Sequence, residues 1–118
     1  MEILEERRKI RDEVIRGARD WARGLPFKAS AILIGSYARG DFNLWSDVDI
    51  VLIAEMGGNP LERLKRIDFP PGFEVIPLTL EEFLILLRRG NPIAVEALNK
   101  GIVLRDDFDV RRLRRGYY

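Results

Sequence analysis

Apolar residues recur along the chain with two different periods, and these periods predict where helices and strands lie. Between Glu2 and Arg23 they return mainly every three, four or seven positions with charges between them, which predicts an amphipathic helix that ends near Gly24. Two later segments are short, apolar and followed by glycine, which predicts strands over Ala29–Ile34 and Val48–Ala54. The first half of the chain is therefore expected to form one long helix and two strands.

The second half of the chain alternates helices with short strands. Asn59 and Pro60 are typical of a helix start, and Thr79 with Glu82 forms a capping box before the next helix. The expected elements are helices over 60–67, 80–89, about 92–100 and 106–115, the last one basic, with strands over 73–78 and 102–104. This alternation predicts one α/β or α+β domain, residues 1–118, with a small mixed sheet flanked by helices.

Composition limits the chemistry and the location of the protein. The 118 residues include no cysteine or histidine, so thiolate nucleophiles, imidazole bases and the usual zinc ligands are missing, and oxygen ligands for Mg²⁺ or Mn²⁺ remain. The formal charge of +1 favours no class of partner. Without a long apolar run or a secretory leader, we expect a cytoplasmic protein with no membrane contact. The 33% charged residues and the absence of glutamine are typical of a thermophile.

Two aspartates, Asp47 and Asp49, lie one residue apart beside an apolar run. Because side chains alternate along a strand, both carboxylates face away from the side that Val48 and Ile50 share. Two like charges on one side of a strand stay ionised most easily when a cation lies between them. The pair therefore predicts a divalent metal site.

A glycine and a serine, Gly35 and Ser36, follow the first predicted strand and precede a short helical turn. Backbone N–H groups and a hydroxyl at such a turn bind phosphate, and Arg39 can reach the same anion. Alone, the pair is more typical of an ordinary tight turn than of a phosphate site. The loop to Asp47 and Asp49 is long enough for the second strand to return beside the first, so we expect the phosphate turn and the carboxylates at one end of the sheet.

The run GSYARGDFNLWSDVDIVLI resembles the signature of the DNA polymerase β-like nucleotidyltransferase superfamily, G-S-x-A-R-G followed by a short loop and S-D-x-D. The match rests on Gly35, Ser36, Arg39, Gly40, Ser46, Asp47 and Asp49. The short chain is similar to minimal nucleotidyltransferase (MNT) domains in particular. The resemblance implies a nucleotidyltransferase fold and metal-dependent transfer of a nucleoside monophosphate, AMP from ATP being expected, to an acceptor hydroxyl, with release of pyrophosphate.

The resemblance also implies roles for single residues. Asp47 and Asp49 would bind two metal ions, Mg²⁺ or Mn²⁺. The nucleotide would be bound by Gly35, Ser36, Arg39 and Ser46. The superfamily usually supplies a third acid from a later strand, and Glu74 is the candidate for this catalytic and metal-binding position. The alternative is that Glu74 is an ordinary surface glutamate at the start of a strand.

The acceptor and the partner are the least defined part of the prediction. MNT proteins often pair with a helical HEPN protein as the antitoxin of a toxin–antitoxin system, so the resemblance implies such a partner; a homo-oligomer is the alternative. The basic tail with Tyr117 and Tyr118 suits either a polynucleotide acceptor or a solvated or oligomer-contacting helix. The competing class of function is a catalytically weak nucleotide-binding or protein-interaction module that docks on a helical partner.

Overall fold

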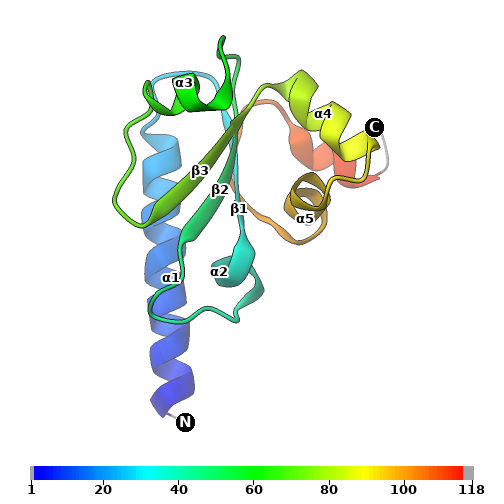
Figure 1. Ribbon diagram of the computed structural model, residues 1–118. Helices are drawn as coiled ribbons and strands as arrows, with labels where there is room; N and C mark the ends of the chain where they lie inside the picture. The colour runs from blue at the N-terminus through cyan, green and yellow to red at the C-terminus, as the bar shows by residue number, and fades with distance from the viewer. Residues whose placement is uncertain (1, 116–118) are drawn as a thin grey trace.

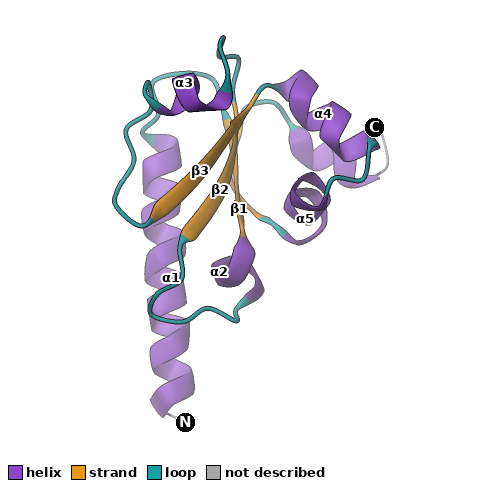
Figure 2. Cartoon of the chain, in the orientation of Figure 1, coloured by secondary structure: helices purple, strands orange, loops and turns teal. Residues whose placement is uncertain are grey.

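The computed structural model describes residues 2–115 and confirms the expected α+β fold with a small mixed sheet (Figures 1 and 2). The sheet has four strands in the order β3-β2-β1-β4; β1 is antiparallel to β2 and β4, whereas β2 and β3 are parallel. The elements are α1 (Glu2–Arg23), β1 (Ser30–Ile34), α2 (Gly35–Arg39), β2 (Val48–Ile53), α3 (Pro60–Leu64), β3 (Phe73–Leu78), α4 (Leu80–Arg88), α5 (Pro92–Lys100), β4 (Ile102–Asp106) and the 3₁₀ helix η1 (Val110–Arg115).

Both faces of the sheet are packed against helices, and alternation along the strands divides the core into two layers. On one face, Leu33 and Ile50 pack with Ala18 of α1, together with side chains from α2 and α3. On the other face, Val51 and Phe83 share a second layer with α4, α5 and η1. Figure 1 shows α1 on one side of the sheet and α4 and α5 on the other. Polar side chains on the inner strands are therefore unusual and need a reason.

Asp49 is the polar exception on β2. It follows the same alternation as Val51 and Ile53, so its side chain lies on the face that α4 and α5 cover. Its register partner in β1 is Ile34, the last residue before α2. The fold thereby places Asp49 next to the start of α2, at one end of the sheet.

Two predicted helices differ from the structure. The helix expected through Ile67 ends at Leu64, because the next residues form tight turns in which Arg66 N and Ile67 N donate to carbonyls three residues earlier. The α-helix expected from Asp106 is wrong: Asp106 is the last residue of β4, and its carboxylate accepts hydrogen bonds from Ser30 Oγ (2.9 Å) and Val110 N (2.8 Å). A contact between distant segments thus keeps Asp106 in the sheet. The helix that follows begins only at Val110 and is a 3₁₀ helix.

The basic tail is a candidate surface for a polynucleotide acceptor. Arg114 donates from Nε to Leu98 O (2.8 Å) and from Nη2 to Gly101 O (2.9 Å), so this side chain fastens η1 to the end of α5. Tyr117 and Tyr118 lie outside the described residues. Within residues 2–115, no helix combines the length and the apolar character that crossing a membrane requires.

Candidate active site

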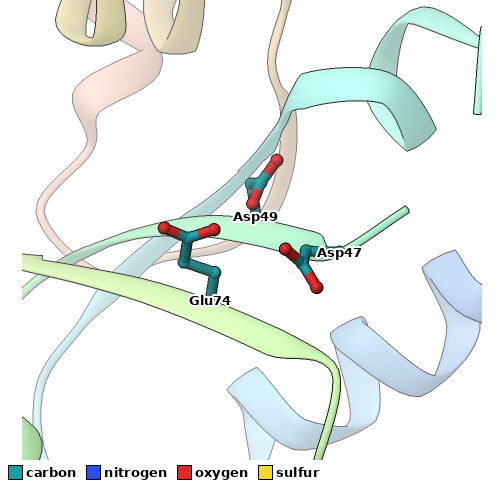
Figure 3. Close-up of side chains that lie close together, drawn as sticks. All are labelled: Asp47, Asp49 and Glu74. Carbon is teal, nitrogen blue, oxygen red and sulfur yellow. The ribbon is translucent and has the colours of Figure 1, made fainter. Parts of the chain in front are cut away.

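Three carboxylates meet at the end of the sheet where β2 and β3 begin. Asp49 and Glu74 are direct register partners in the parallel β2–β3 pair, and Asp47 lies just before β2. One carboxylate oxygen from each of the three residues lies within 4.8 Å of the others. Figure 3 shows the three side chains gathered on one side of the two strands. The structure therefore brings together all three acids that the sequence analysis selected.

Crowding of these acids changes the proton affinity of Asp49. Burial raises the pKa of Asp49 to about 6, and the adjacent Glu74 carboxyl and the charges of Asp47 and Glu96 act in the same direction. A group of hard oxygen donors that repel one another is the ligand set that Mg²⁺ and Mn²⁺ prefer. The donor chemistry at this position thus fits a divalent cation.

The glycine of the Gly-Ser turn is required by its backbone and by its surroundings. Gly35 has φ +77°, which L side chains rarely adopt, and it directly follows the last residue of β1. A Cβ atom at this position would overlap Oδ2 of Asp49. Only glycine lets the start of α2 approach the carboxylates this closely, so the turn and the acids form one site.

An open cavity of about 400 Å³ joins the turn to the acids. Its polar lining comes from Gly35, Ser36, Arg39, Asp49, Glu74 and Glu96, and its apolar lining comes from Ile34, Ile76 and Ile93. A cavity of this size admits part of a small molecule, such as the phosphates of a nucleotide. Three of the four residues predicted to bind nucleotide therefore line the cavity that holds two of the acids.

Ser46, the fourth predicted nucleotide ligand, contacts its own loop. Its Oγ accepts a hydrogen bond from Asn43 N (2.9 Å), and Asn43 Oδ1 accepts one from Trp45 N (2.8 Å). These bonds fix the short loop that leads to Asp47. The role of Ser46 as a nucleotide ligand stays a prediction.

Two arginines of α1 position α2 from behind. Arg11 donates from Nε to Tyr37 O (2.7 Å) and from Nη2 to Ala38 O (2.8 Å), and Arg7 Nη2 donates to Phe42 O (2.9 Å). Cationic donors suit the free carbonyls at the end of a helix. The long first helix thus holds the segment that carries Ser36 and Arg39.

Glu96 of α5 is a site residue that the sequence analysis missed. Its Oε2 accepts a hydrogen bond from Gly35 N (2.7 Å), and its Oε1 accepts one from Arg39 Nη1 (3.2 Å). The pattern of α5 predicts a helix but does not indicate which end of the sheet the helix meets. Only the packing of α5 against the sheet brings this acid to the Gly-Ser turn.

Comparison with protein families gives a match to a model described as "Nucleotidyltransferase domain", over residues 8–77. The matched segment contains the Gly-Ser turn and the three converging acids, whereas Glu96 lies beyond it. Comparison with curated proteins gives no match, and comparison with solved structures gives none either.

Proposed function

Because the chain belongs to the nucleotidyltransferase domain family, we propose that it transfers a nucleoside monophosphate, AMP from ATP, to a hydroxyl group of an acceptor. The acceptor oxygen bonds to the α-phosphorus, the bond from that phosphorus to the β-phosphate oxygen breaks, and pyrophosphate leaves. The observation that carries this proposal is the convergence of Asp47, Asp49 and Glu74 beside the turn formed by Gly35 and Ser36.

The protein would contribute binding, orientation and proton transfer. Asp47, Asp49 and Glu74 would hold two Mg²⁺ or Mn²⁺ ions. When bound, such ions neutralise phosphate charge and lower the pKa of the attacking hydroxyl. Ser36 and Arg39 orient the phosphates, and the Glu74 carboxylate accepts the acceptor's proton.

Nucleotide and cation should bind together. The cavity lining contains the acids Asp49, Glu74 and Glu96 against the single cation Arg39, so the described residues alone repel a triphosphate. We therefore expect ATP to bind weakly without a divalent ion.

For the acceptor, we favour a hydroxyl group on a helical HEPN-type partner, in a toxin–antitoxin pair. This choice rests on the resemblance to MNT domains, and the open cavity is compatible with it because a large acceptor can approach from solvent. A docking module without useful catalysis is the second candidate, and the experiment below separates the two.

The test is transfer of label from ATP carrying ³²P at the α-phosphate, with Mg²⁺, to the protein product of the adjacent gene. An enzyme labels that protein, and Asp47→Asn combined with Asp49→Asn abolishes labelling. The control is Asp12→Asn, which makes the same charge change on the exposed side of α1. Labelling that survives the double substitution would refute the site, and a stable complex without label would favour the docking module.

A further inference from the structure

Glu96 already occupies two groups that a nucleotide phosphate would need. One carboxylate oxygen is held by the Gly35 N–H and the other by the Arg39 guanidinium, at 2.7 and 3.2 Å. A phosphate binds such a turn in the same manner, with separate oxygens on a backbone N–H and an arginine. Glu96 thus takes the place of an anion at the turn.

In this arrangement the positive charge of Arg39 is already paired with carboxylates of the protein. Its Nε donates to Asp41 Oδ2 (3.2 Å) while Nη1 contacts Glu96, so two carboxylates neutralise it. Among the described residues that line the cavity, Arg39 is the single cation. A triphosphate that enters therefore meets a site whose positive charge is already paired.

We propose that Glu96 competes with the nucleotide's phosphates for Gly35 N–H and Arg39, so that nucleotide binds only when the Glu96 side chain moves away. This inference rests on the proposed function, because it concerns the same phosphate-binding turn. Glu96 is then a residue that sets nucleotide affinity, and it acts through the groups that it covers.

The side chain of Glu96 has the freedom that such a movement needs. Its ion pair with Arg39 is partly exposed, with 28% and 42% of the two side chains accessible, and pairs of this kind are weak. Lys100 lies one helical turn further along α5, at the i+4 position where it can receive a displaced glutamate. Glu96 and Lys100 line a common hollow on the outer side of α5. Rotation of one side chain therefore suffices, without movement of the helix.

The same exchange bears on release of the product. Pyrophosphate leaves from the turn where the triphosphate was bound, and the returning Glu96 carboxylate takes over the same two donors. The residue thus weakens the binding of substrate and of product alike.

Binding of Mg²⁺-ATP and of inorganic tripolyphosphate with Mg²⁺, measured by calorimetry on the full chain, tests this inference. Glu96→Ala removes the competitor and is expected to tighten both ligands about tenfold or more. Glu96→Gln keeps the shape and the hydrogen-bond acceptor for Gly35 but loses the charge, so a smaller gain of the same sign is expected. Glu13→Gln on the exposed side of α1 makes the same charge change and should bind as the unaltered protein does.

A second observable follows the contact itself. The Gly35 amide signal in ¹H–¹⁵N NMR spectra should shift in both Glu96 variants and when tripolyphosphate is added to the unaltered protein. If both variants bind ATP as weakly as the unaltered protein, or more weakly, Glu96 supports the turn instead and the inference is overturned. The proposed function would still stand in that case, provided that Asp49→Asn removes the Mg²⁺ dependence of ATP binding. Absence of ATP and tripolyphosphate binding in every variant would overturn both.

Discussion

Two glutamate–arginine ion pairs in this protein consist of the same chemical groups but differ in their role. Glu82 with Arg63 joins α4 to α3, and Glu96 with Arg39 joins α5 to α2. Each glutamate also accepts a backbone N–H, and both of these hydrogen bonds measure 2.7 Å. Burial of the arginine and the neighbouring charges distinguish the two pairs.

The Glu82 pair is built to hold the fold. Arg63 is 5% exposed and donates twice to Glu82, at 2.6 and 3.3 Å, and once to Pro77 O. Arg63 and the Thr79 N–H lower the pKa of Glu82, so its charged form is favoured. Removing one partner leaves the other without its main contact.

The Glu96–Arg39 pair lies among further carboxylates, which carry the same charge as Glu96. Arg39 is exposed and shares itself with Asp41, and the nearby Asp49 has a pKa raised to about 6. The fold holds these carboxylates close together although their negative charges repel one another. The contrast indicates that the Glu82 pair contributes stability, whereas the Glu96 pair belongs to the candidate active site.

The largest expected effect is on the rate of label transfer, which should fall far more in Asp49→Asn than in Glu82→Gln. Asp49→Asn should lower the rate of label transfer at least about a thousandfold, because it removes an anionic ligand from the metal-binding group. Glu82→Gln should change that rate only about twofold at temperatures where the variant is folded. Transfer by Asp49→Asn at a tenth of the normal rate or more would contradict the assignment.

The two arginines should differ in stability. We expect Arg63→Ala to lower the free energy of unfolding by about 2 kcal/mol, since Arg63 is buried and donates to both Glu82 and Pro77. Arg39→Ala should lower it much less, since Arg39 is exposed. Urea denaturation measures both. Equal losses would show that burial does not separate the pairs as described.

The two acids should respond to pH with opposite signs. A raised carboxyl pKa means that Asp49 costs stability as pH rises from about 4 through about 6, so Asp49→Asn should stabilise the protein at pH 7 by about 1 kcal/mol after allowance for solvent screening. Because the pKa of Glu82 is lowered in the folded protein, its ionised carboxylate stabilises the fold at pH values above the pKa of the unfolded state. This stabilisation is lost as the pH falls through the folded-state pKa. Thermal unfolding of Asp49→Asn and Glu82→Gln between pH 3 and 8 checks both signs. Asp49→Asn less stable than the unaltered protein at pH 7 would contradict the account.

Local patterns predicted the parts of the site that local geometry determines. Alternation along a strand placed Asp47 and Asp49 on one side, and the same rule gave Glu74 the face opposite Phe73 and Val75. Once β3 lies parallel to β2, the register sets Glu74 directly beside Asp49. The helix caps at Thr79 and Asn91 were predictable for the same reason, because a cap depends on neighbours in sequence.

Two contacts between distant segments were beyond prediction. Glu96 reaches Gly35 only because α5 packs on the face of the sheet that carries Asp49, and no spacing in the sequence encodes that contact. The helix predicted from Asp106 is wrong for the same reason, because the bond of Asp106 to Ser30 of β1 joins residues 76 positions apart. In both cases a carboxylate that local patterns leave unassigned receives its partner from tertiary packing.

Paramagnetic broadening by Mn²⁺ shows whether Asp47, Asp49 and Glu74 form the cation site of a nucleotide-binding centre. Small amounts of Mn²⁺ with ATP are added to ¹⁵N-labelled protein, and amide signals are followed in ¹H–¹⁵N NMR spectra. If the cation binds there, the signals of Gly35, Asp49 and Glu74 are lost selectively, and they are not lost in the variant with both Asp47→Asn and Asp49→Asn. Broadening centred instead on the acidic first turn of α1, or unchanged by the two substitutions, would contradict this site.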